Sequence, residues 1–236
     1  MISTKVNAIF MTSQEFVREL VSCYEQELNP QKAKAMSAYM RNRFPYLGIN
    51  RPERDKINKL LFPLIKKEVN ENFLKEVTTA MWQKQEREYH YFALDLLSKF
   101  VNHLTPSALP FLTDLAVQHA WWDSIDYLAS KIIGKIILKY PDLQAAMDIL
   151  NTDDNIWLKR IAILHQLSYK QKTDPIRLFH YCLTNAKNSD FFIRKGIGWA
   201  LREYAKINPQ AVIDFVEANE GTLSNLSKRE ALRRLK

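Results

Sequence analysis

The sequence predicts an all-α protein in which helical pairs repeat along the chain and stack into a curved solenoid. Only five of the 236 residues are glycine, and apolar residues recur at spacings of three and four, as in 57–65 and 93–100. Three aromatic residues, Trp122, Trp157 and Phe192, lie 35 positions apart and each opens an apolar helix. A period of this length is typical of solenoids built from helical pairs.

Helix starts can be read along the chain from polar residues that cap the first turn. Thr12 opens the first helix, and Glu15 completes a capping box with it. Four later helices are predicted to start at a polar residue followed by proline. These pairs are Asn29-Pro30, Thr105-Pro106, Asp174-Pro175 and Asn208-Pro209. The whole chain is predicted to hold about a dozen helices of roughly 10 to 18 residues.

Each repeat also carries a charged residue near the first turn of its helix, namely Asp126, Arg160 and Lys195. Equivalent positions of successive repeats line one concave surface of a solenoid. These three side chains are therefore candidates for a common groove. Solvated positions on three separate helices would give the same pattern.

The charge balance indicates an anionic partner. The chain has a formal net charge of +8 and a pI near 9.3, which makes a polyanion such as nucleic acid a plausible ligand. The last ten residues hold five cations against one acid. This end is expected either to lie along a phosphate backbone or to face water.

The composition also limits the class of protein. Cys23 and Cys182 lie far apart and the five histidines show no ligand spacing, so no disulfide framework, metal or other cofactor is expected. There is no signal-peptide pattern and no run of about 18 apolar residues. We therefore expect a cytoplasmic protein without a membrane partner.

The segment Trp121–Asp126 is the most informative for chemistry. Trp122 and Asp126 are four apart and so share a helix face, which places a large aromatic surface beside a carboxylate. Asp123 brings a second carboxylate near. The alternative is that both tryptophans are core residues and both acids cap the helix that they start.

Three further segments combine basic and aromatic residues. In 154–160 the fork of Arg160 suits phosphate oxygens, although a surface pair or an intramolecular salt bridge is an equal alternative. In 194–204 two glycines, two positions apart, indicate that something packs closely on that helix face, most often another helix. In 39–44 an aromatic hydroxyl lies near two arginines.

Taken together and in order, these segments resemble the AlkD-type DNA glycosylases from about residue 12 to 236. The resemblance rests on the motifs Tyr-Met-Arg-Asn-Arg-Phe, Trp-Trp-Asp-Ser-Ile-Asp, Asp-Asn-Ile-Trp-Leu-Lys-Arg, Gly-Trp-Ala-Leu-Arg-Glu-Tyr and Leu-Ser-Lys-Arg-Glu-Ala. It implies one domain of HEAT-like repeats over 12–236, with a concave basic groove around duplex DNA. Residues 1–11 fall outside the resemblance and are expected to be an extension.

The resemblance also implies a role for individual residues. The catalytic aspartate of the family falls on Asp126, its paired cleft tryptophans on Trp122 and Trp199, and its phosphate-binding arginine on Arg160. Tyr39 corresponds to an aromatic residue that contacts DNA. Basic residues within or beside the motifs are expected to bind DNA as well: Arg43, Lys159, Arg194, Lys195, Lys228 and Arg229.

The implied activity is the excision of N3- and N7-alkylated purines from duplex DNA, which begins base excision repair. Such a purine is already cationic and leaves as a neutral base, so the enzyme mainly has to stabilise an oxocarbenium-like sugar. No lysine stands out as a Schiff-base nucleophile, so we expect a monofunctional enzyme that leaves an abasic site. A monomer is expected for an enzyme that tracks along duplex DNA.

Two other functions fit parts of the pattern. A HEAT-like protein that binds DNA without catalysis would need the basic residues but not a carboxylate, which repels phosphate. An RNA-binding helical repeat would carry stacking aromatics in each repeat. Aromatic residues do recur in three repeats, but the charged residue that accompanies them changes each time. The pattern therefore favours an RNA-binding repeat protein less than the other two functions.

Overall fold

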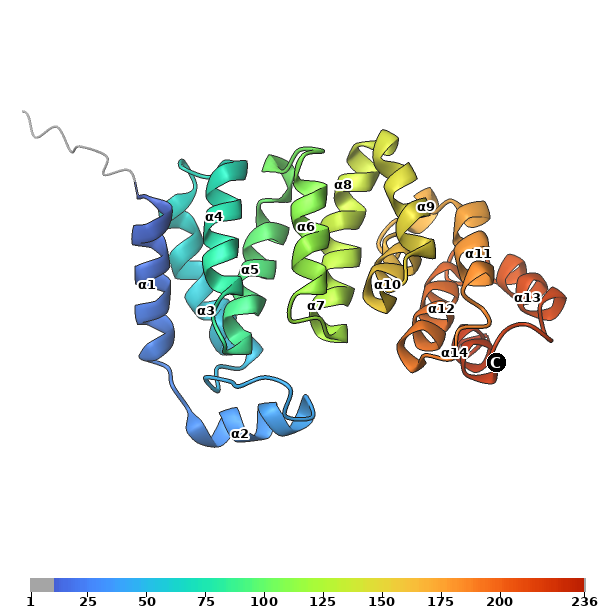
Figure 1. Ribbon diagram of the computed structural model, residues 1–236, viewed down its shortest axis with the longest axis horizontal. Helices are drawn as coiled ribbons and strands as arrows, with labels where there is room; N and C mark the ends of the chain where they lie inside the picture. Colours follow the sequence, from blue (N-terminus) through green and yellow to red (C-terminus); the bar gives the residue numbers. More distant parts are fainter. Residues whose placement is uncertain (1–10, 236) are drawn as a thin grey trace, which may run out of the picture. The chain divides into compact units, whose positions relative to one another are not determined.

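The computed structural model describes residues 11–235, and every regular element within them is helical (Figure 1). This confirms the all-α prediction. The chain groups into two compact units, Met1–Leu104 and Thr105–Lys236. The single domain over 12–236 stays a prediction, and the extension over 1–11 lies outside the described residues apart from Met11.

The elements of the two units follow one another with short connections. The first unit contains α1 (Ser13–Glu25), α2 (Pro30–Tyr39), α3 (Arg51–Leu61), η1 (Phe62–Ile65), α4 (Glu71–Trp82), α5 (Arg87–Lys99) and η2 (Val101–His103). The second contains α6 (Ala108–Val117), α7 (Trp122–Tyr127), η3 (Leu128–Ile133), α8 (Gly134–Lys139), η4 (Pro141–Leu143), α9 (Gln144–Thr152), α10 (Ile156–Leu164), η5 (Lys170–Lys172), α11 (Pro175–Thr184), α12 (Phe191–Tyr204), α13 (Pro209–Ala218) and α14 (Asn225–Ala231).

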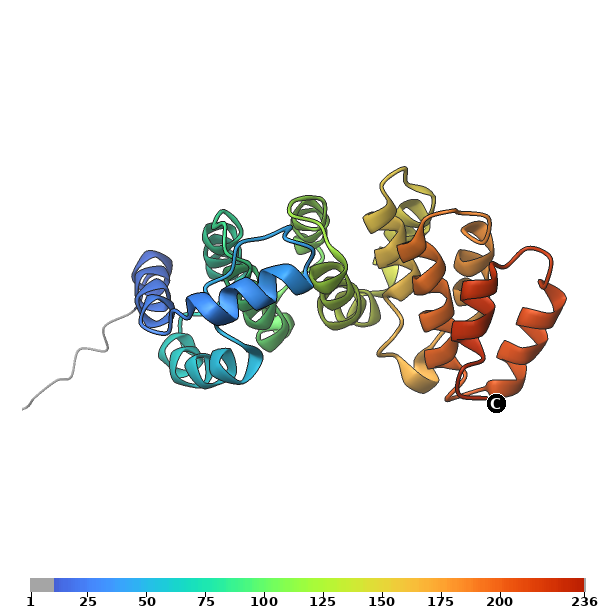
Figure 2. The same ribbon diagram turned by 90° about the horizontal axis from the view of Figure 1, so that it is seen from below.

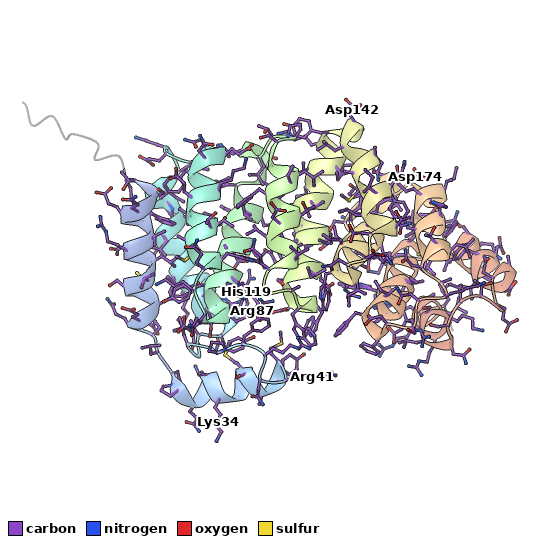
Figure 3. The ribbon with its side chains drawn as sticks, in the orientation of Figure 1. Lys34, Arg41, Arg87, His119, Asp142 and Asp174 are labelled. Atoms are coloured by element: carbon purple, nitrogen blue, oxygen red, sulfur yellow. The ribbon has the colours of Figure 1, made fainter. Side chains whose placement is uncertain are left out.

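The first unit forms around an aromatic core. Phe16, Leu20 and Tyr24 recur every fourth residue of α1, so they share one face, and all three are fully buried. Tyr24 stacks on Tyr89 of α5, with ring centroids 5.4 Å apart. Helix α2 differs, since it buries no residue and runs crosswise to the other helices of this unit (Figures 1 and 2). Its Lys34 extends outward from the unit (Figure 3).

A buried carboxylate holds the loop that follows α2. Glu88 accepts hydrogen bonds from the backbone N–H groups of Leu47, Gly48 and Ile49, at 2.9 to 3.1 Å. These bonds satisfy three donors that the loop itself leaves without partners. The guanidinium of Arg87 lies 3.9 Å from the centre of the Phe44 ring. The chain that leaves α2 is thereby fixed to α5.

The second unit is organised around α10 and α12, which pack against each other; α10 also contacts α7 and α9, and α12 contacts α14. Figure 2 shows α12 and α14 side by side. At the N-terminal ends of α7, α10 and α12, the rings of Trp121, Trp157 and Phe192 form a cluster with centroids 5.0 to 5.7 Å apart. This cluster fixes the relative positions of three helix starts.

Most of the predicted helix starts are confirmed. Thr12 and Glu15 form the capping box, and three of the four proline pairs begin a helix. The exception is Thr105-Pro106, because α6 begins only at Ala108. There the N–H of Ser107 donates to Oγ1 of Thr105 at 3.3 Å and closes a turn before the helix.

The three aromatic residues of the 35-residue period each lie at or next to the first residue of a helix: α7, α10 and α12. The HEAT-like identity of the repeats and the concave basic groove stay predictions. Within residues 11–235, no helix is both long and apolar enough to cross a membrane.

Candidate functional site

Two neighbouring clefts in the second unit share three residues, Trp122, Asp126 and Trp199. The larger cleft has a volume of about 430 Å³ and the smaller one about 260 Å³. Trp122 and Asp126 come from α7, and Trp199 comes from α12. The structure therefore brings together the three residues that were expected to be catalytic.

The two adjacent tryptophans at the start of α7 have different environments. Trp121 is only 4% exposed and packs in the aromatic cluster, whereas the neighbouring Trp122 lines both clefts. Asp126 follows one turn later on the same face. Trp121 thus lies in the core and Trp122 in the clefts. The alternative that both tryptophans are core residues is correct for Trp121 alone.

The chain continues from α7 into the π-helical segment η3. The hydroxyl of Ser130 donates to the backbone carbonyl of Asp126 at 2.7 Å, within the turn where the helix widens. Short π-helical turns recur at functional sites because they shift a helix face locally. Hydrophobic spacing in the sequence does not reveal such a turn.

Asp126 is held by an arginine from the next repeat. The Nε of Arg160 donates to Oδ1 of Asp126 at 2.7 Å and its Nη2 donates to Oδ2 at 3.0 Å. Its Nη1 donates to the backbone carbonyl of Phe192. Arg160 as a whole is only 3% exposed. Its two parallel hydrogen bonds fix the plane of the carboxylate. The intramolecular salt bridge is thus present, while the phosphate contact of Arg160 stays a prediction.

Burial and the arginine act in opposite directions on the carboxylate. Removal from water raises the pKa of Asp126 above its ordinary value, and the positive charge and hydrogen bonds of Arg160 lower it. The nearby Asp123 raises it further. The result is a carboxylate that is paired and oriented but still reaches the cleft, with 16% of its side chain exposed.

The two clefts differ in the charge of the residues that line them. The smaller one adds three cations to the shared residues, namely Arg160, Lys195 and Arg202. The larger one adds two carboxylates, Asp123 and Glu203, together with the cation Lys131. Phosphate oxygens suit the first set, and a cationic group beside indole faces and carboxylates suits the second. Asp126 lies where the two sets meet.

Glycines in α12 allow its neighbours to approach closely. A Cβ atom on Gly196 would lie 3.0 Å from Nη1 of Arg160, and one on Gly198 would lie 2.5 Å from the Cβ of Glu230. The predicted close packing is therefore correct. Another helix, α14, covers Gly198, whereas at Gly196 the neighbour is the arginine that holds Asp126.

The repeat-matched charges Asp126, Arg160 and Lys195 all line the smaller cleft. The other residues expected to contact DNA do not line either cleft. Lys159 is half-buried, and Arg229 is exposed. Arg194 donates to the carbonyl of Asn188 at 2.8 Å, and Lys228 to that of Glu220 at 3.0 Å.

In the first unit, Tyr39 is 76% exposed and Arg43 is also exposed. The DNA contacts of these two residues, and of the basic residues in the second unit, stay predictions.

Two residues of this region were missed by the sequence analysis. Arg202 lines the smaller cleft, and the buried Glu230 binds it at 2.5 Å. Glu230 is a single acid within a basic C-terminal run, which is a weak signal in the sequence. Helical spacing from Trp199 to Arg202 would have placed the arginine on the same face.

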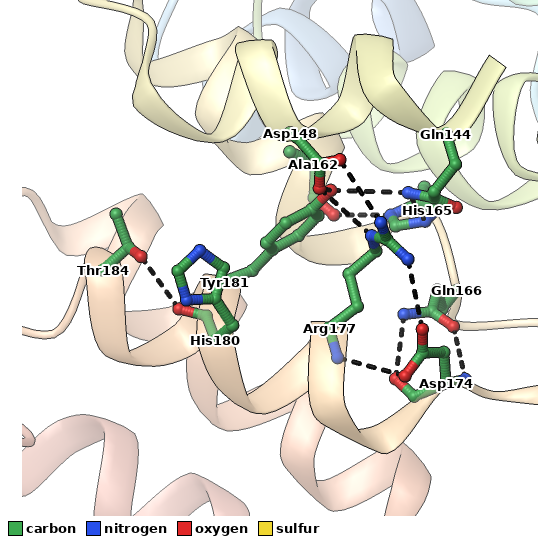
Figure 4. Close-up of polar contacts among 10 residues, drawn as sticks. All are labelled: Gln144, Asp148, Ala162, His165, Gln166, Asp174, Arg177, His180, Tyr181 and Thr184. Atoms are coloured by element: carbon green, nitrogen blue, oxygen red, sulfur yellow. Dashed lines mark hydrogen bonds and ion pairs between the residues drawn. The ribbon is translucent and has the colours of Figure 1, made fainter.

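A separate polar cluster joins α9, α10 and α11 (Figure 4). Arg177 pairs with both Asp148 and Asp174, and the hydroxyl of Tyr181 donates to Asp148 at 2.5 Å. His165 is fully buried beside them. None of these residues lines the two clefts, so the cluster serves the packing of three helices.

Comparison with known proteins gives a consistent family. Residues 22–235 match the model of a family described as DNA alkylation repair enzyme. The chain is also similar to a solved structure, a predicted DNA alkylation repair enzyme from Enterococcus faecalis, with 33% sequence identity and a TM-score of 0.82. This similarity covers 88% of the present chain and 96% of that one. No match is found among curated proteins.

Proposed function

Because the chain belongs to the DNA alkylation repair enzyme family, we propose that it is an AlkD-type DNA glycosylase. The proposed reaction is hydrolysis of the N-glycosidic bond of N3- and N7-alkylated purines in duplex DNA. One observation carries the proposal: a carboxylate, fixed by two hydrogen bonds from Arg160, lines a cleft together with two half-buried tryptophans. A protein that only binds phosphate does not need a carboxylate that reaches the cleft, because its charge repels phosphate.

The chemistry that this arrangement supports is the stabilisation of a cation. An alkylated purine carries a positive charge, so it departs as a neutral base without strong acid catalysis. The positive charge then develops on the deoxyribose as the bond lengthens. In the proposed mechanism the carboxylate of Asp126 stabilises this sugar and orients the attacking water.

The two indole faces of Trp122 and Trp199 assist the same step. A cation over an aromatic face is stabilised by about 0.5 to 2 kcal/mol, more when water is excluded. Both residues line both clefts with Asp126. They therefore stabilise the cationic nucleotide from two helices in the proposed complex.

Arg160 favours the ionised form of the carboxylate and fixes its orientation. Without a partner, a carboxylate in this degree of burial would protonate more readily, since desolvation raises its pKa. The arginine opposes that effect only in part, since the pKa stays raised, and because its guanidinium is planar it sets the direction in which the carboxylate oxygens face. Preorganisation of this kind is what makes a fixed charge effective in a transition state.

Release of the base is the experiment that tests the proposal. The purified protein is incubated with duplex DNA that carries 7-methylguanine or 3-methyladenine, and free base, abasic sites and strand breaks are measured separately. We expect free base and an equal amount of abasic sites without enzyme-dependent strand cleavage. A protein that binds the duplex but releases neither base would instead be a non-catalytic helical DNA-binding protein.

A further inference from the structure

Glu230 of α14 lies between two cations of α12. Nζ of Lys195 is 2.7 Å from Oε1 of Glu230, and Nη1 of Arg202 is 2.5 Å from Oε2. The glutamate side chain is 7% exposed, whereas Lys195 is 38% and Arg202 19% exposed. The carboxylate is thus inside the protein, and both cations extend from it toward solvent.

The packing of the two helices makes this bridge possible. A Cβ on Gly198 would overlap the Cβ of Glu230, so only a glycine lets the glutamate approach α12 at this point. The hydrogen bonds from Lys195 and Arg202, together with the charges of both cations, lower the pKa of Glu230 and favour the ionised carboxylate. Each carboxylate oxygen binds a different cation.

Both cations belong to the cleft that contains Asp126. Lys195, Trp199 and Arg202 recur at spacings of four and three, so they share one face of α12, and all three line the smaller cleft. Lys195 has three N–H donors and Arg202 has five. Within the described residues, Glu230 accepts from one nitrogen of each, and further donors remain for a ligand.

We propose that Glu230 is a positioning residue that holds Lys195 and Arg202 as the binding site for one phosphate of the damaged strand, next to Asp126. This inference rests on the proposed function for the identity of the ligand. It adds Arg202 to the DNA-binding residues and gives α14 a role in the site. Two cations with fixed positions bind a phosphate at a lower entropic cost than two mobile ones.

The direction in which one substitution changes the affinity for DNA distinguishes a positioning role of Glu230 from a simple effect of its charge. Glu230→Gln removes a negative charge beside a polyanion, so electrostatics alone predicts tighter DNA binding. Positioning predicts weaker binding, because both cations lose their fixed partner. Glu217→Gln is a matched control, since Glu217 is an exposed glutamate of α13 in the same unit.

The experiment measures binding to a duplex that carries a tetrahydrofuran abasic analogue, at a series of sodium chloride concentrations. We expect Glu230→Gln to bind about tenfold more weakly than the wild type, while Glu217→Gln binds equally or slightly more tightly. The double variant Lys195→Gln and Arg202→Gln should reduce the magnitude of the negative slope of log K against log salt by about 0.9, the value for one phosphate. In that background Glu230→Gln should have no further effect.

Equal or tighter binding by Glu230→Gln overturns the proposal. So does full affinity in the Lys195→Gln and Arg202→Gln double variant, which keeps the test decisive if the glutamate variant does not fold. Thermal unfolding of each variant separates a lost phosphate site from lost structure. This experiment measures DNA binding and not base release. A wild type that releases no base would therefore refute the glycosylase proposal, while the binding data would still decide whether the phosphate site exists.

Discussion

The carboxylate of Asp126 and the guanidinium of Arg160 face each other through two hydrogen bonds, although the residues are 34 positions apart in sequence. The pair joins α7 to α10 at the edge of the cleft. Removing one member of a buried pair leaves the other charged group without compensation, which is strongly destabilising. This relationship links the stability of the second unit to the chemistry that we propose for it.

Arg160→Gln is expected to lower the free energy of unfolding by about 3 kcal/mol, at the low end of the buried-pair range because Asp126 is partly exposed. Urea denaturation measures the change. The control is Lys206→Gln, which breaks the solvent-exposed pair with Glu203 and should cost about 1 kcal/mol or less. Equal effects of the two substitutions would contradict the importance of the buried pair.

The rate of base release should fall at acid pH as Asp126 is protonated. Because burial raises the pKa of this carboxyl above the ordinary aspartate value, the fall should begin at a higher pH than for an exposed aspartate. Arg160→Gln removes the group that opposes the rise, so the acid limb should move to still higher pH. Single-turnover rates at constant ionic strength, corrected for depurination without enzyme, test this. An acid limb that Arg160→Gln leaves in place would contradict it.

The tryptophans should separate into two classes. Trp199→Ala removes an indole from the cleft, and we expect about a tenfold lower rate of base release, equivalent to the loss of one cation–π contact, with modest destabilisation. Trp121→Ala empties a buried site in the aromatic cluster and should lower the free energy of unfolding by about 3 to 5 kcal/mol. Paired measurements of rate and urea stability distinguish them. Similar profiles for the two variants would argue against a separate cleft role.

The stability of the protein should fall between pH 6.5 and 4 because of His165. Full burial lowers the pKa of this imidazole to about 4, so the unfolded chain binds a proton in this range and the folded protein does not. Stability therefore decreases as pH falls, by about 3 kcal/mol in total for this group. His165→Gln should flatten the profile measured by urea denaturation, whereas the exposed His180→Gln should not. A profile that His165→Gln leaves unchanged would contradict this assignment.

Local signals in the sequence predicted much of the fold. Caps such as Thr12 and Asn208 set helix starts because the side chain bonds a backbone N–H that the helix leaves unpaired. The Thr105-Pro106 start was wrong by two residues, because the backbone first closes a turn from the N–H of Ala108 to the carbonyl of Thr105 and α6 begins only at Ala108. The signals for helix starts are local, so they can be used without knowledge of tertiary packing. They do not distinguish an isolated turn from the first turn of a helix.

Part of the candidate site was predictable for the same reason. A spacing of four put Trp122 and Asp126 on one face, and the 35-residue period put Arg160 beside them. The direction of the Arg160 side chain and the bridge made by Glu230 depend on contacts between distant segments. An arginine can bind a nearby carboxylate or a phosphate. Neither the periodicity nor the charge pattern of the sequence predicts which of the two it binds.

The most direct test of the proposed function compares the wild type with Asp126→Asn on duplex DNA containing 7-methylguanine, under single-turnover conditions with enzyme in excess. The asparagine keeps the shape of the side chain and removes its charge. The proposed mechanism predicts base release by the wild type and a rate about 100-fold or more lower in the variant, with duplex binding retained. Base release by Asp126→Asn at the wild-type rate would contradict the role of this carboxylate.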